Sequence, residues 1–124
     1  MNAVVQQIKK CMSELTGTPQ GKINARFMFS PEFIGFQGHF PDKPILPGVC
    51  KIQAVMVILQ EKNKKKVRLK EVVLAKFFSP VSCGEEIVFE CCEHRENNEE
   101  AMVKALVTSK GNKIAELQLK VSYY

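Results

Sequence analysis

The residue best suited to chemistry is His39, which lies in a loop studded with prolines. Residues 38–41 read Gly-His-Phe-Pro, and Pro44 and Pro47 follow. Each proline fixes φ and lacks a backbone N–H, so the segment around His39 is stiffened without belonging to regular structure. An imidazole titrates near neutral pH and can accept a proton during a reaction. His39 is therefore the first candidate for a catalytic base.

A helix is predicted directly after this loop. The backbone N–H groups of Gly48 and Val49 lie at its positive end, where they can polarise a carbonyl, and Gly48 permits close approach. Lys51 and Gln53 are the only polar side chains in residues 49–59. A helix that is apolar around nearly its whole circumference has to be enclosed by other elements.

The remaining elements supply that enclosure. Residues 3–15 show apolar positions at helical spacing, and residues 22–30 alternate as a half-buried strand. Residues 67–78 are apolar on both faces in their second half, which is typical of a central strand. Further strands are expected over 86–92, 101–108 and 114–123, with a hairpin turn at 110–113. The pattern predicts one α+β domain over residues 1–124, with an antiparallel sheet curled around the buried helix.

The net charge of +5 comes in large part from the basic residues of segment 62–70. This segment carries no aromatic side chain for base stacking and reads as a helix end, a turn and a strand start. A solvated basic connection is favoured over a nucleic-acid site.

The cysteines and histidines do not form a pattern of metal ligands. The five cysteines are odd in number and show no C-x-x-C spacing, so reduced thiols are expected. Cys91 and Cys92 are adjacent in a predicted strand and point to opposite faces. His94 is expected on the surface, far in sequence from His39, and no metal or cofactor is expected.

No apolar run reaches the length of a membrane span. The N-terminal residues lack the order of basic region, apolar core and cleavage site that a signal peptide shows. We expect a cytoplasmic protein without a membrane span.

The motif around His39 resembles that of a known enzyme family. The segment 38–41, followed by Pro44, Pro47-Gly48-Val49 and a buried helix with a polar residue at position 53, is similar to the hotdog-fold (3R)-hydroxyacyl-acyl-carrier-protein dehydratases. A weaker resemblance continues through segments 76–81 and 83–86, so that it covers about residues 22–122. It implies a hotdog fold, a homodimer or trimer of dimers, and an acyl-thioester tunnel at the protomer interface.

The resemblance also implies roles for individual residues. Dehydration of a 3-hydroxyacyl thioester needs a base for the α-proton, an acid for the departing hydroxyl and donors at the thioester oxygen. His39 and Gln53 fall at the catalytic positions. The surrounding substrate-binding residues would be Phe40, Pro47, Gly48 and Val49.

This chain departs from the family at the acid. The family carries Glu or Asp five residues after the glycine of Pro-Gly, whereas this chain has Gln53. An amide neither gives up nor takes a proton at accessible pH, although it can donate and accept hydrogen bonds. Asp42 can orient the His39 imidazole or cap a turn, and the turn is favoured. Glu61 is expected to be solvated, so neither carboxylate restores the acid.

Three outcomes follow from this substitution. His39 can carry both proton transfers through a shared water, which gives a slow dehydratase. Gln53 can orient a water for thioester hydrolysis, as in hotdog thioesterases. Alternatively the chain binds an acyl thioester without turnover, beside a second subunit that supplies the carboxylate.

The basic residues suggest a carrier as partner. Lys51, Lys64 and Lys65 are candidates for docking an acidic acyl carrier protein. The predicted setting is fatty-acid-like or polyketide-like biosynthesis, with a homodimer, a trimer of dimers or a heteromeric partner.

Overall fold

The computed structural model describes residues 3–36 and 45–124. Six strands form one sheet in the order β1-β2-β4-β5-β6-β3, and every neighbouring pair is antiparallel. The strands are β1 (Met12–Gly17), β2 (Lys22–Met28), β3 (Val67–Phe77), β4 (Glu86–Arg95), β5 (Glu100–Ser109) and β6 (Asn112–Tyr123). The helices are α1 (Ala3–Cys11), the 3-10 turn η1 (Ile34–Phe36) and α2 (Gly48–Asn63).

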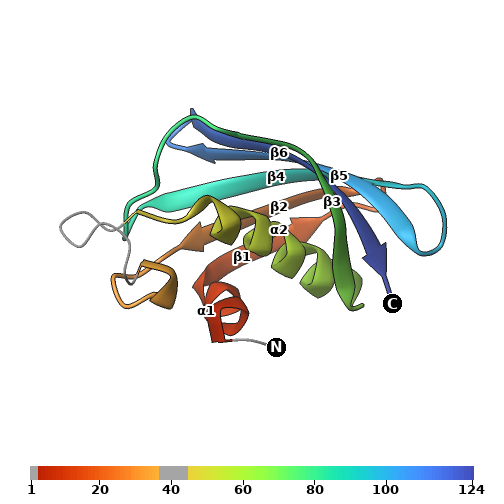
Figure 1. Cartoon of the computed structure of the whole chain (residues 1–124), viewed down its shortest axis with the longest axis horizontal. Helices are drawn as coiled ribbons and strands as arrows, with labels where there is room; N and C mark the ends of the chain where they lie inside the picture. Colours follow the sequence, from red (N-terminus) through yellow and green to blue (C-terminus); the bar gives the residue numbers. More distant parts are fainter. Residues whose placement is uncertain (1–2, 37–44) are drawn as a thin grey trace.

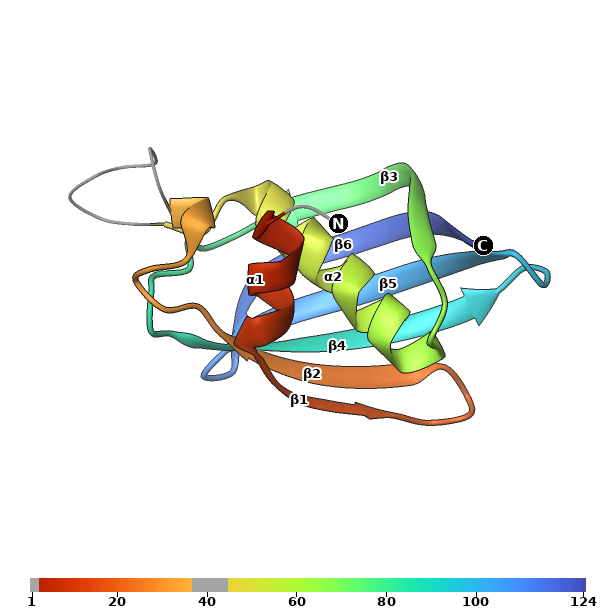
Figure 2. The same cartoon turned by 90° about the horizontal axis from the view of Figure 1, so that it is seen from below.

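The sheet curves around α2, as the sequence pattern predicted (Figure 1). Seen from below, α2 crosses the strands diagonally and α1 lies beside it (Figure 2). The α+β hotdog arrangement is therefore confirmed. Among the residues that the structure describes, no helix is both long and apolar enough to cross a membrane.

The core lies between α2 and the concave face of the sheet. The strand residues that face α2 alternate with outward ones along β2, β5 and β6, in the period of two that a half-buried sheet requires. The fully buried side chains of α2 include Ala54, Val55, Ile58 and Leu59. Three phenylalanines, Phe27, Phe29 and Phe89, fill the centre with adjacent rings.

The turn between β5 and β6 has the geometry of a tight hairpin. The β5–β6 hairpin turns through Lys110 and Gly111, whose φ angles are 51° and 82°. Two successive left-handed residues make the tight turn that matches the twist of the strands. The predicted hairpin at 110–113 is confirmed.

Two elements of the structure differ from those predicted from the sequence. The helix predicted over 3–15 ends at Cys11, and residues 12–17 form β1, whose partner is β2. The spacing of Met12 and Leu15 fits a helix, but both also pack against the core from a strand. Pairing with β2 supplies the backbone of these residues with partners and overrides the helical pattern.

The strand predicted as central lies instead at an edge. Among the described strands β3 pairs only with β6. Its side chains Leu69, Val72, Val73 and Phe77 are between 37% and 48% exposed. Apolar residues on both faces of a strand indicate that both faces are covered, but they do not say by what. The described part of the chain leaves them exposed.

Candidate functional site

The loop that carries the predicted base is anchored at both of its ends. His39, Phe40 and Asp42 lie outside the described residues. Before them, Phe36 ends η1 and is 5% exposed. After them, Ile45 forms a β-bridge with Ser82, and the Leu46 N–H donates to the Val81 carbonyl at 2.8 Å. The core thus fixes the chain on either side of the loop.

The loop leads into the N-terminus of α2. Pro47 precedes the first helical residue, Gly48, and no described side chain forms a capping hydrogen bond at the helix start. A Cβ on Gly48 would lie 2.9 Å from Cζ of Phe77, so a larger residue would displace the ring. Val49 is 60% exposed. In the single chain, the Phe77 side chain therefore takes the place close to the Gly48 backbone that the prediction gave to a substrate carbonyl.

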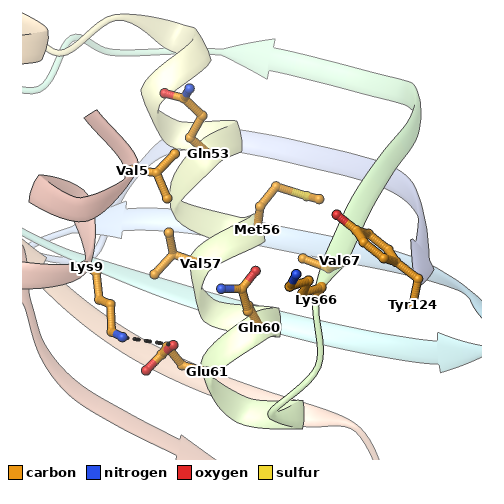
Figure 3. Close-up of a pocket in the computed structure, with 10 residues that line it drawn as sticks. All are labelled: Val5, Lys9, Gln53, Met56, Val57, Gln60, Glu61, Lys66, Val67 and Tyr124. Atoms are coloured by element: carbon orange, nitrogen blue, oxygen red, sulfur yellow. Dashed lines mark ion pairs between the residues drawn. The ribbon is translucent and has the colours of Figure 1, made fainter. Parts of the chain in front are cut away.

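Gln53 lies one turn further along α2 and opens into a cavity of about 410 Å³ (Figure 3). The cavity lies between α2, α1, the start of β3 and the C-terminus, and its lining residues are Val5, Lys9, Gln53, Met56, Val57, Gln60, Glu61, Lys66, Val67 and Tyr124. Val5 lies beside Gln53, whereas Met56 extends toward Tyr124. The predicted catalytic position on α2 thus lines a cavity.

The cavity is apolar around Gln53 and charged at its other end. Lys9 and Glu61 form an ion pair of 3.4 Å across α1 and α2. The Glu61 side chain is only 21% exposed, so the expectation that it is solvated is wrong. Because its carboxylate is engaged by Lys9 two turns from Gln53, it does not provide the missing acid at that position.

The predicted residues divide between two pockets in the single chain. Pro47, Gly48 and Lys51 line a second pocket of about 480 Å³, whose far wall is Phe77 and Phe78. Gln53 lies on the other cavity. The helix start and the Gln53 amide therefore do not meet in one described pocket.

Lys51 is buried, although it was predicted as a surface docking residue. It is 3% exposed, and its Nζ lies 3.5 Å from the Leu46 carbonyl oxygen and 5.2 Å from the centroid of the Phe77 ring. Burial lowers the pKa of the Lys51 ammonium, an effect that Cys50 and Glu85 partly oppose. A side chain that is enclosed in this way does not present its charge to a carrier protein on the surface of the chain.

The other two predicted docking residues are exposed. Lys64 takes the left-handed conformation at the C-cap of α2, with φ of 55°, and its N–H donates to the Gln60 carbonyl at 2.9 Å. Lys65 follows in the connection to β3. Residues 62–70 therefore form a helix end, a turn and a strand start.

The cysteines do not gather at a site. Cys91 is buried and Cys92 exposed, so they face opposite sides of β4 as predicted. Within residues 3–36 and 45–124 there is no group of three or more side chains suited to hold a metal ion. His94 is exposed on β4, as expected.

Two features near the predicted site residues are not indicated by the sequence: aromatic side chains that border the two pockets, and a buried polar cluster. Phe77 lies against the start of α2, and Tyr124 borders the Gln53 cavity. The cluster joins Asn63, Glu93, Arg95 and Tyr123, where the Asn63 amide donates to the Tyr123 hydroxyl at 3.0 Å. Both features bring together residues far apart in the sequence, so no local pattern indicates them.

Comparisons with known proteins bear on this site. A family model for ApeI-like proteins, described as ApeI dehydratase, matches residues 15–118. No curated protein sequence matches the chain significantly.

Solved structures share the fold. The dehydratase heterocomplex ApeI:P from Xenorhabdus doucetiae superposes with a TM-score of 0.73 at 20% identity, over 90% of this chain and 96% of that one. An uncharacterized protein, PH1136 from Pyrococcus horikoshii, gives 0.71 at 12% identity, over 92% and 84%. Cj0977, a sigma28-regulated virulence protein from Campylobacter jejuni, gives 0.71 at 11% identity, over 100% and 92%.

Proposed function

Because the chain belongs to the ApeI-like dehydratase family, we propose that it eliminates water from a 3-hydroxyacyl thioester to give a trans-2-enoyl thioester. The observation that carries this proposal is the match of the family model over residues 15–118, which include the His39 loop and all of α2. The Gln53 cavity supports it, because an acyl substrate needs an apolar space beside the helix.

The proposed reaction divides among three parts of the site. His39 takes the α-proton, and the electron pair of that C–H bond passes into the thioester as enolate character. The N–H groups of Gly48 and Val49 stabilise the thioester oxygen. As the double bond forms, the C3–O bond breaks, and the proton on His39 passes to the departing hydroxyl, which leaves as water.

Gln53 would position the hydroxyl or a shared water without exchanging a proton itself. Its amide can donate one hydrogen bond and accept another at the same time. With His39 as the only proton carrier, the reaction would be slower than in a site that also holds a carboxylic acid.

Gln53 also favours a second function, in which the chain acts as the partner of another subunit. The Xenorhabdus doucetiae protein was solved as a heterocomplex, and the amide at position 53 leaves this chain without an acid at that point of α2. In this alternative the chain binds the acyl thioester with little or no turnover, and a second subunit supplies the carboxylate.

The proposed substrate form is an acyl group on an acidic carrier protein, in fatty-acid-like or polyketide-like biosynthesis. Lys64 and Lys65 are exposed and carry the positive charge that such docking requires. Reversing both charges should weaken carrier binding, with a strong dependence on salt. Unchanged binding would remove these lysines from the docking surface.

We further propose that the chain assembles through β3, as a homodimer, a trimer of dimers or with a related partner. β3 is an edge strand with apolar side chains exposed on both faces. An exposed apolar edge strand invites pairing with another chain.

The deciding experiment follows three thioesters: 3-hydroxyacyl, trans-2-enoyl and saturated acyl. Loss or gain of water is recorded separately from thiol release, for the wild type, for Gln53→Glu and for the control Gln6→Glu, which lies at an exposed position of α1. We expect reversible water loss without thiol release in the wild type, and a rate increase only in Gln53→Glu. Thiol release alone would instead indicate a thioesterase, and activity confined to Gln53→Glu would indicate the partner function.

A further inference from the structure

The start of α2 holds a positive charge, that of Lys51, which no salt bridge within residues 3–36 and 45–124 neutralises, although Glu85 attracts it electrostatically. Lys51 lies in the first turns of the helix, and no acidic residue lies in the first turn. The N-terminus of a helix carries partial positive charge, so a cation there is unfavourable unless an anion accompanies it. The helix end and Lys51 thus add to each other at one place.

Burial adds to the cost. Lys51 is 3% exposed, and taking an ammonium out of water is costly unless it is paired and hydrogen-bonded. Its hydrogen bond to the Leu46 carbonyl is 3.5 Å long, at the outer limit for such a bond, and the Phe77 ring offers a cation–π contact at 5.2 Å. In the described ranges no salt bridge joins it to a carboxylate.

The surroundings of this charge are those of a pocket rather than of a sealed core. Lys51 lines the space of about 480 Å³ at the helix start, together with Pro47, Gly48 and the rings of Phe77 and Phe78. Both rings are about half exposed, and none of the described residues that line the pocket is a carboxylate. An apolar wall beside a buried ammonium and a helix N-terminus fits a ligand that carries a negatively charged oxygen on an apolar chain.

We propose that Lys51 and the N-terminus of α2 form an anion subsite that receives the thioester oxygen as it becomes an enolate. This rests on the proposed function, in which His39 removes the α-proton and the electron pair moves toward that oxygen. The ammonium is then a charged partner beside the N–H groups of Gly48 and Val49. A fixed charge in a water-poor site stabilises the developing negative charge more than the neutral substrate, so it lowers the barrier instead of only tightening binding.

The subsite is tested directly with octanoate and octanamide, which have the same shape but differ in charge. We expect calorimetry to show that the wild type binds octanoate about ten- to a hundredfold more tightly than octanamide, the range for a hydrogen bond to a charged group. Lys51→Met and Lys51→Gln should both abolish this preference, since both remove the charge. Lys104→Met, on the exposed face of β5, should retain it.

Equal binding of the two probes by the wild type, failure of octanoate to bind, or a preference that survives in both Lys51 variants would overturn the proposal. Circular dichroism confirms that each variant is folded.

The second readout is turnover. We expect Lys51→Met to lower kcat for dehydration with little change in KM, because the charge acts mainly on the enolate. A loss confined to KM would contradict this. A wild type that shows the octanoate preference but eliminates no water would refute the proposed function and leave the subsite standing, so the two failures are distinguishable.

Discussion

Lys51 is the residue at which stability and proposed function conflict. Its charge is enclosed, next to a helix end of the same sign. In the described part of the chain its direct contacts are a long hydrogen bond and an aromatic ring, and Glu85 adds a longer-range electrostatic attraction. Such a residue destabilises the folded chain until an anion arrives. A site that stabilises a developing charge has this property before its ligand binds.

We predict that Lys51→Met raises the free energy of unfolding by about 1–3 kcal/mol, because the methionine fills the same space without a charge. Urea denaturation at neutral pH measures the change. The gain should shrink as the pH rises toward 10.5, the ordinary pKa of lysine.

The direction follows from the lowered pKa of Lys51, since the unfolded chain then binds more protons than the folded chain and wild-type stability rises relative to the variant. Cys50 and Glu85 are the neighbouring titratable groups, and both remain in the variant. A wild type more stable than Lys51→Met at neutral pH would show that the ammonium is well compensated in the folded chain.

Gln53 and Lys51 show which features of single residues could be predicted from the sequence and which could not. The apolar helix and its two polar residues are readable from the sequence, as is the amide at the acid's position. The direction in which each side chain points is not, because Lys51 and Gln53 are only two residues apart yet line different pockets. Burial of Lys51 depends on Phe77, from a strand distant in sequence.

At the scale of elements, α2 is held at its C-terminal end by a buried polar cluster. The Tyr123 hydroxyl donates to the Glu93 carboxylate, whose side chain is 7% exposed, and Asn63 at the end of α2 donates to the same hydroxyl. Burial, together with this hydrogen bond to Glu93, raises the pKa of Tyr123. The cluster therefore ties α2 to β4 and β6.

Tyr123→Phe should lower the free energy of unfolding by about 1–3 kcal/mol, because it leaves the buried Glu93 carboxylate without one of its donors. The matched control is Tyr124→Phe, since Tyr124 is 64% exposed and keeps its ring contact with Arg68. The control should change stability by about 0.5 kcal/mol or less. Equal losses in the two variants, measured by urea denaturation, would show that the hydroxyl of Tyr123 does not act through the cluster.

The elements themselves could largely be predicted from local patterns. Strands with clean alternation, such as β6, and the turn at Lys110 and Gly111 follow from side-chain period and backbone preference. Residues 12–17 could not be assigned in this way, because the spacing of Met12 and Leu15 satisfies both a helix and an irregular edge strand. Their pairing with β2 is a long-range interaction that no local window contains.

At the scale of the whole molecule, β3 is the feature that a single chain leaves incomplete. Its apolar side chains are exposed at the sheet edge, and Phe77 and Phe78 border the pocket at the start of α2. These apolar side chains on both faces of β3 are the reason why its sequence resembles that of a central strand. A second chain on this edge would cover it and place new side chains beside the site.

Val73→Lys should therefore lower the mass of the oligomer that we propose to form through β3, because a charged side chain on an edge strand disfavours pairing with another chain. Val73 is 42% exposed, so the folded chain itself should tolerate the change. Thr16→Lys, on the opposite edge strand β1, is the control and should retain the wild-type mass. Sedimentation equilibrium gives the masses, and a wild-type mass for Val73→Lys would exclude this part of β3 from the interface.

The proposed function depends on water elimination with His39 as the base. The direct measurement is the absorbance of the conjugated enoyl thioester formed from a 3-hydroxyacyl thioester by the wild type, His39→Ala and His94→Ala. The predicted result is product formation by the wild type and by His94→Ala, whose histidine is exposed on β4, with the rate of His39→Ala reduced by about 10²–10⁴-fold. Absence of enoyl product in the wild type would contradict water elimination, and equal rates in all three proteins would contradict the role of His39 as the base.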